Sequence, residues 1–286
     1  MESIILVIKG FFMGIANVIP GVSGGTIAII LGIYEKFIKS ISNLMKDIKE
    51  NLKSLIPIVI GMGLAIITMS KVVGYSYDEF PLPTLMFFVG LVFGGIPMLI
   101  KNVKGKKESK ELSSYIIAII TFLIVIFMAS YKFIFSLNSE VSFSNMNLMG
   151  YILLFVVGIV AAATMVIPGI SGSLVLMILG YYYPIIETIN SLFKEDFISN
   201  AIILSVFGIG VVFGILLIAK LLEILFKNYS TKTYFGVIGF VIASIVAIPL
   251  SAIIELGEIP MNITQIVISL IMIASGTLIS YKLGDK

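Results

Sequence analysis

Long apolar runs alternate with short polar connections along the chain, and the pattern of the first half recurs in the second. Five apolar segments are predicted in the first half, over residues 3–19, 22–38, 55–73, 84–100 and 112–133. Five more follow, over residues 148–167, 171–189, 202–225, 234–254 and 263–282. Because a helix needs about 20 apolar residues to cross a bilayer, the pattern predicts an all-α polytopic membrane protein.

The first two segments of each half are joined by a Pro-Gly-x-Ser-Gly sequence. Residues 18–24 read VIPGVSG, and residues 166–172, which lie 148 positions later, read VIPGISG. When residues 17–41 are aligned without gaps to residues 165–189, 12 of the 25 positions are identical. We therefore interpret residues 1–135 and 136–286 as two repeats that together form one membrane domain.

The first two segments of each repeat are short for a membrane crossing. Each has about 17 apolar residues, and Pro20 or Pro168 breaks the helix between them because proline has no N–H to donate. We predict a re-entrant helix hairpin in each repeat, followed by three transmembrane helices; two full crossings are the alternative. Broken backbone inside a membrane is tolerated only where protein or a cavity surrounds it. Paired breaks at corresponding positions therefore indicate a transporter's binding site.

Composition and charge support this topology. The chain is 59% hydrophobic and 12% charged, which excludes a soluble domain, and its net charge of +3 is too small to indicate a nucleic-acid surface. With an odd number of crossings in each half, the second repeat is inverted relative to the first. Sixteen of the 19 lysines then lie on one side with both termini, and Lys71, Lys132 and Lys194 lie on the other. Lysine excess marks the cytoplasm, so both termini are predicted to be cytoplasmic, in a plasma-membrane protein.

The sequence contains no cysteine and no histidine. Their absence excludes a thiol nucleophile, a disulfide, a Ser-His pair and a His/Cys metal site. Ser23 has no evident base that would activate it. We therefore expect neither an enzyme nor a metal or other cofactor.

The two broken segments carry groups suited to an anion. Glycines allow close approach of the backbone, Ser23 is suited to cap the following helix, and the first N–H groups of that helix lack intrahelical partners. We predict that two such helix N-termini, one from each repeat, bind an anion in the middle of the membrane; the alternative is that the motif only kinks two packed helices. The candidate ligands are Asn17, Gly21, Ser23, Gly24, Gly25, Thr26, Thr164, Gly169, Ser171, Gly172 and Ser173.

The motif resembles the signature of a known family. Residues 14–26 read GIANVIPGVSGGT, Gly32-Ile33-Tyr34-Glu35 follows, and the second copy occupies residues 167–173. This resembles the bacterial and archaeal polyprenyl-phosphate transporter family over essentially the whole chain. The resemblance implies movement of undecaprenyl phosphate, or a related polyprenyl phosphate, from the outer to the cytoplasmic leaflet, which recycles the carrier lipid for cell-envelope synthesis.

A lipid phosphate carries about −1.5 to −2 charges near neutral pH. Its inward movement opposes an inside-negative potential by about 2.3 kcal/mol per charge per 100 mV. Either a coupling cation or proton accompanies the lipid, or its consumption inside draws the flux, and Glu35, Asp78 and Glu79 are the candidate coupling residues. Lys71 and Lys220 are candidates for guiding the phosphate, although lysines at the membrane interface also snorkel.

A second function remains open at this stage. Helix N-termini with glycine- and serine-rich loops also suit chloride or inorganic phosphate, so the alternative is a small-anion channel or exchanger. Competition between a lipid phosphate and a free anion would distinguish the two functions.

The predicted orientation can be tested directly. An epitope tag inserted in residues 101–110 should be accessible only from the cytoplasm, because this segment carries five of the lysines. A tag near Glu140 should be accessible from outside in intact cells. Detection of the 101–110 tag on the outside would contradict the topology.

Overall fold

The protein is all helical in the computed structural model, which describes residues 2–18, 22–134, 141–143, 146–192, 196–256 and 262–284. These residues form 13 helices and no strand. Seven of the helices are long and apolar enough to cross a membrane. Large apolar side chains such as Ile67, Ile198 and Leu270 are more than half exposed, as expected where lipid rather than water covers a helix. The prediction of an all-α polytopic membrane protein is confirmed.

The two halves contain the same succession of helices. The first half consists of α1 (Glu2–Val18), α2 (Gly24–Ile30), α3 (Tyr34–Ser42), α4 (Ile48–Glu79), α5 (Pro81–Val103), the 3-10 helix η1 (Lys107–Lys110) and α6 (Leu112–Ile134). The second consists of α7 (Leu148–Val166), α8 (Gly172–Ile178), α9 (Tyr182–Ser191), α10 (Phe197–Asn228), α11 (Ser230–Leu256) and α12 (Ile263–Gly284). Apart from η1, each half thus has a first helix, two short helices and three long ones.

The second apolar segment of each half differs from the prediction. The runs over residues 22–38 and 171–189 predict one helix each, but each contains two helices. The break follows from Gly32 and Gly180, which adopt φ values of +69° and +77°. These left-handed conformations end a helix and suit glycine, which has no Cβ atom. In the second half the break bends α8 and α9 by 105°.

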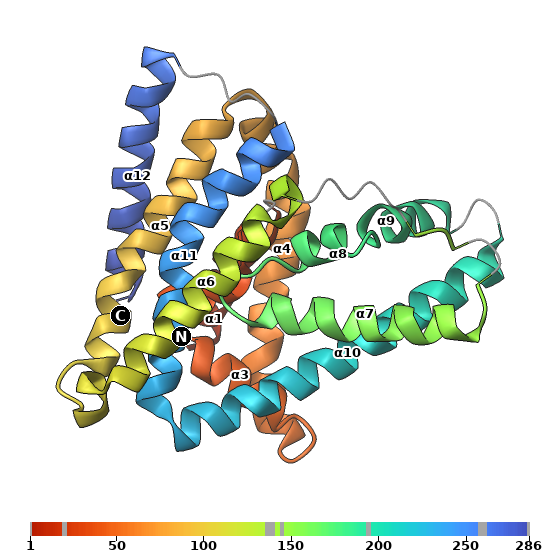
Figure 1. Ribbon diagram of the computed structural model, residues 1–286, viewed down its shortest axis with the longest axis horizontal. Coiled ribbons are helices and arrows are strands. Elements are labelled where there is room, and N and C mark those ends of the chain that lie inside the picture. The colour runs from red at the N-terminus through yellow and green to blue at the C-terminus, as the bar shows by residue number, and fades with distance from the viewer. Residues whose placement is uncertain are drawn as a thin grey trace.

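The long helices pack in pairs that interlock the two halves. α1 packs along α4, and α7 packs in the same way along α10. α5 packs against α12, and α6 packs against α11, so the last helix of each half lies against the other half (Figure 1). α5 and α11 also contact each other. The halves are therefore joined into one body, although each repeats the other's internal pairing.

Backbone contacts at glycine join the α1–α4 and α7–α10 pairs. A Cβ atom at Gly61 would lie 2.1 Å from the Val7 carbonyl oxygen, and one at Gly10 would lie 2.2 Å from that of Ile58. Equivalent residues, 148 or 149 positions later, make the same contacts: Gly210 with Phe155 and Gly158 with Phe207. Small residues at these crossings allow the close packing that associates helices in a membrane.

The lysine-rich connections of both halves meet at one end of the molecule. Lys232 of α11 forms an ion pair with Glu111 at 3.1 Å, and the Thr231 hydroxyl donates to Glu108 at 2.8 Å. These contacts join the α5–α6 connection to the start of α11. In Figure 1 both segments lie at the lower side of the view, as does the α3–α4 connection. This gathering is what the predicted topology requires of the lysine-rich side.

The close contact between α1 and α4 at Gly61 predicts that two substitutions in α4 differ in their effect on stability. Gly61→Leu should destabilise the protein by about 1–3 kcal/mol or more, because the added side chain overlaps the α1 backbone. Gly63→Leu is the matched control, since a Cβ atom at Gly63 would meet nothing within 4 Å. Thermal unfolding in detergent would measure both variants. Equal stability of the two would contradict the proposed α1–α4 contact.

Candidate functional site

The start of α2 meets the Pro-Gly-x-Ser-Gly segment of the second half in the interior of the protein. The Gly169 amide donates a hydrogen bond of 2.7 Å to the hydroxyl oxygen of Thr26, which is buried. The Tyr34 hydroxyl donates to the Val166 carbonyl at 3.0 Å. A Cβ atom at Gly25 would lie 2.9 Å from the same carbonyl oxygen. Residues more than 130 positions apart are thus brought together at the start of α2.

Two polar contacts hold α2 antiparallel to α1. The side-chain oxygen of Asn17, near the end of α1, accepts a hydrogen bond of 3.0 Å from the amide of Gly24, the first residue of α2. Lys9, half-way along α1, donates to the Leu31 carbonyl at the other end of α2 at 2.7 Å. Helices α1 and α2 therefore lie side by side and antiparallel.

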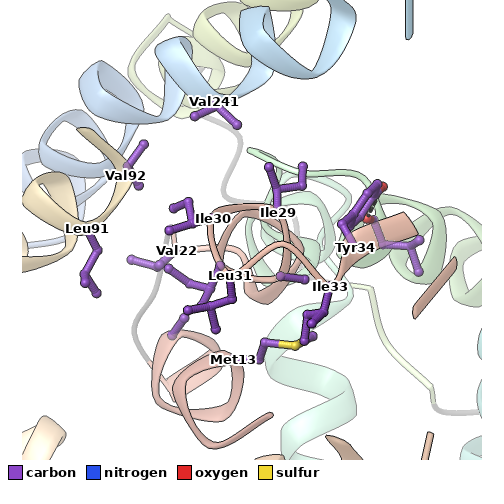
Figure 2. Packing of buried hydrophobic residues seen from close by; sticks show 14 of the residues in the cluster. Met13, Val22, Ile29, Ile30, Leu31, Ile33, Tyr34, Leu91, Val92 and Val241 are labelled. Atoms are coloured by element: carbon purple, nitrogen blue, oxygen red, sulfur yellow. Dashed lines mark hydrogen bonds between the residues drawn. The ribbon is translucent and has the colours of Figure 1, made fainter. Parts of the chain in front are cut away.

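The packing around α2 places its first turn deep in the fold. All seven residues of α2 are buried, and the helix contacts α1, α5 and α7. Figure 2 shows Ile29 and Ile30 on the side of α2 that faces Val92 of α5 and Val241 of α11. In α8, by contrast, only Gly172 and Val175 are buried. Helix α2 is therefore more completely enclosed than α8.

Ser23 lies at the start of α2 with a buried hydroxyl. The residue is 6% exposed, and its Oγ atom has no hydrogen-bond partner among the residues that the structure describes. The expectation that this hydroxyl caps the helix is wrong, because Ser23 occupies the N-cap position without a side-chain cap bond. A buried hydroxyl without a partner costs about 1–3 kcal/mol. Such a group requires an explanation, and a ligand is one.

The corresponding loop of the second half has its hydroxyls paired. Ser171 and Ser173 lie within hydrogen-bond distance of each other, at 2.8 Å. Gly169 has a φ of +81°, and a Cβ atom there would lie 2.6 Å from the Phe240 carbonyl oxygen. Only glycine fits this position without displacing α11.

The other predicted site residues either lie outside the described residues or have their described contacts elsewhere. Pro20 and Gly21 lie outside the described residues, as does the side chain of Asp78. The Thr164 hydroxyl donates within its own helix, to the Ala161 carbonyl at 2.8 Å. Lys71 and Glu79 lie on α4, the lysine exposed and the glutamate one residue before Phe80 at the helix end.

A polar cluster that sequence reasoning missed joins α3 to the second half. Glu223 of α10 accepts hydrogen bonds from Ser42 at 2.6 Å and from Asn43, and it forms an ion pair with Lys220 at 2.7 Å. Lys220, a candidate guide for the phosphate, is therefore paired with a carboxylate. Glu223 is the only acidic residue in the apolar run over 202–225. A lone carboxylate in such a run could have identified it.

Glu35, the first candidate coupling residue, also contacts the second half. Its carboxylate accepts a hydrogen bond from the hydroxyl of Tyr234 in α11. The ammonium of Lys106 lies over the Tyr234 ring, 5.8 Å from its centre. Glu35 is thus part of the contact between α3 and the lysine-rich end of the molecule.

Comparisons with known proteins show the family of the chain. The family model described as undecaprenyl phosphate translocase-like matches residues 13–258. A relative from Staphylococcus aureus, named polyprenyl-phosphate transporter, is 34% identical over 97% of this chain and 95% of its own. A relative from Vibrio cholerae with the same name is 29% identical over 83% of this chain and 75% of its own. No solved structure matches. The chain therefore belongs to the undecaprenyl phosphate translocase-like family.

Proposed function

We propose that this protein transports polyprenyl phosphate across the membrane and moves the phosphate head group from the outer to the cytoplasmic leaflet. The names of its relatives support the substrate class. The proposal rests on the buried, unpartnered hydroxyl of Ser23, which lies near the hydrogen bond between Thr26 and Gly169. Such transport returns the carrier lipid for cell-envelope synthesis.

The proposed phosphate site is centred on the start of α2. The amides of Gly25 and Thr26 are the second and third of the helix, so they have no intrahelical acceptor by position. Together with the Ser23 hydroxyl they provide donors on one side of the loop. α2 and α8 have only seven residues each, so we assign binding to these local donors rather than to a long helix dipole. Hydrogen bonds to a charged acceptor are roughly twice as strong as neutral ones.

The remaining candidates take different roles in this proposal. Thr26 and Gly169 are bonded to each other, so they hold the two loops in register. Ser171 and Ser173 supply hydroxyls from the second half, and their mutual bond leaves acceptor and donor capacity for a ligand. The wider site comprises Asn17, Gly21, Gly24, Thr164 and Gly172, with Pro20 and Pro168 as the breaks.

We further propose that the halves are inverted repeats with re-entrant hairpins and that both termini are cytoplasmic. The antiparallel contacts between α1 and α2 support a hairpin, and the meeting of the lysine-rich connections supports the orientation. α7 has 19 residues, which is long enough to cross a membrane. A full crossing by α7 is therefore the alternative in the second half.

Coupling to a cation or proton is proposed at Glu35, with Asp78 and Glu79 as the other candidates. Glu35 contacts Tyr234 of the opposite half, so a change in its charge would alter a contact between the repeats. Two charges moved against 100 mV cost about 4.6 kcal/mol. Flux in liposomes that is indifferent to pH, sodium and potential would exclude coupling.

Substitution of the unpartnered hydroxyl separates binding from stability. Ser23→Ala should leave the thermal unfolding temperature unchanged or raise it, because no hydrogen bond within the described residues is lost. Transport of polyprenyl phosphate into liposomes should fall about tenfold or more, since a hydrogen bond to a charged group is worth about 1.5–3 kcal/mol.

Ser280→Ala is the matched control for this experiment. The Ser280 hydroxyl is also buried and without a partner among the described residues, but it lies on α12. Ser280→Ala should retain both stability and transport. If Ser23→Ala transports as well as Ser280→Ala, the start of α2 does not bind the phosphate.

A further inference from the structure

An apolar groove of about 380 Å³ lies between α6, α10 and α11. Ile117 of α6, Leu221 and Leu225 of α10, and Phe240 of α11 are among its lining residues, and the exposed lining is carbon. Thr121 presents its methyl group there because its hydroxyl donates to the Gly236 carbonyl at 2.9 Å. A cavity of this size falls in the range of small-molecule sites. It is open along one side, where Leu221 is 50% exposed.

The two ends of the groove have different chemistry. One end is formed by Ile167 and Pro168, which directly precede the Gly169 amide that is bonded to Thr26. The other end is formed by Tyr229, Lys232 and Thr233 at the start of α11. The groove therefore runs from the repeated loops to the lysine-rich end of the molecule.

The length of the groove matches one leaflet of a bilayer. From Lys232 to Phe240 there are eight residues of α11, which is about 12 Å at 1.5 Å per residue. Half of a hydrocarbon core of about 30 Å is about 15 Å. A lipid in this groove would have its head group at the membrane surface and its chain directed toward the middle.

The charge at the surface end favours a phosphate head group. Lys232 is paired with Glu111 at 3.1 Å, but its ammonium has three donors, so it can bind a phosphate as well. Residues 101–111, which contact the start of α11, carry five lysines and two glutamates. The surroundings of this end are therefore net positive, and the groove accommodates one apolar chain beneath them.

We propose that the groove is a binding site for polyprenyl phosphate in the lysine-rich leaflet, with the phosphate at Lys232 and the first isoprene units between α6, α10 and α11. This inference rests on the proposed function and assigns the step after the phosphate leaves the loops. The small volume and single apolar channel favour one branched chain over the two acyl chains of an ordinary phospholipid.

Photocrosslinking in nanodiscs tests the site. A benzophenone side chain replaces Leu221, which lines the groove. In the control it replaces Leu217, which lies one turn earlier on α10, is 56% exposed and does not line the groove. The nanodiscs contain phosphatidylglycerol and polyprenyl phosphate, and mass spectrometry identifies each adduct. We expect the polyprenyl phosphate adduct to be at least about fivefold more abundant at position 221 than at 217. Equal adducts at both positions, or mainly phosphatidylglycerol at 221, would overturn the proposal.

A pair of lysine variants tests the head-group end in the same assay. Lys232→Gln should reduce the polyprenyl phosphate adduct at position 221 by about threefold or more. Lys227→Gln, at the end of α10 and outside the groove, should not. An unchanged adduct in Lys232→Gln would overturn the assignment of the phosphate.

Retention of the lipid by the otherwise unaltered protein distinguishes failure of the groove proposal from failure of the proposed function. If polyprenyl phosphate co-purifies with the protein but shows no preference for position 221, the groove proposal fails and the proposed function stands. If no polyprenyl phosphate is retained, the proposed function fails and the groove proposal fails with it.

Discussion

The structure depends on the buried contact between α2 with its flanking residue Tyr34 and the Pro-Gly-x-Ser-Gly segment of the second half. A broken helix inside a membrane exposes backbone groups that lipid cannot satisfy, so such a break persists only where protein supplies partners. Here the Thr26 hydroxyl oxygen accepts the Gly169 amide, and the Tyr34 hydroxyl donates to the Val166 carbonyl. Side chains of the first half thus satisfy backbone groups of the second half. The burial of the second broken segment therefore depends on the first half.

The interlocked helices follow from the same requirement. Because the last helix of each half packs against the other half, the two loops cannot separate without disturbing the α5–α12 and α6–α11 pairs. Glycine crossings hold the α1–α4 and α7–α10 pairs at backbone contact. On this scaffold α2 is fully buried, whereas α8 is only partly buried. The Ser23 hydroxyl is thus buried, and a hydrogen bond is electrostatically stronger inside a protein than in water.

Sequence reasoning could predict the features that depend on length and repetition. Ten apolar segments and the repeated motif are visible directly, and most of the long helices begin and end close to the predicted residues. Helix α4 (Ile48–Glu79) is the exception, because it extends well beyond the predicted segment 55–73 at both ends. The split of each second segment was missed, because Gly32 and Gly180 sit in apolar runs where glycine is also a common packing residue. The failure of Ser23 to cap α2 could not be predicted either. The Gly24 amide instead donates to Asn17, seven residues earlier.

Contacts between the halves were the least predictable part of the site. Glu223 joins α10 to Ser42 at the end of α3 and to Asn43, which follows it, and no spacing rule relates residues about 180 positions apart. The apolar groove likewise depends on how α6, α10 and α11 converge. Such features arise from tertiary packing, and a single sequence carries no direct record of which helices become neighbours.

In the proposed mechanism the paired loops select a lipid with a single phosphate. Native mass spectrometry of the purified protein tests it most directly, with polyprenyl phosphate, polyprenyl pyrophosphate and phosphatidylglycerol offered together and inorganic phosphate as competitor. We expect selective retention of the monophosphate lipid, and we expect that excess inorganic phosphate does not abolish it. Equal retention of all three lipids, or complete displacement by inorganic phosphate, would contradict it and favour a small-anion exchanger.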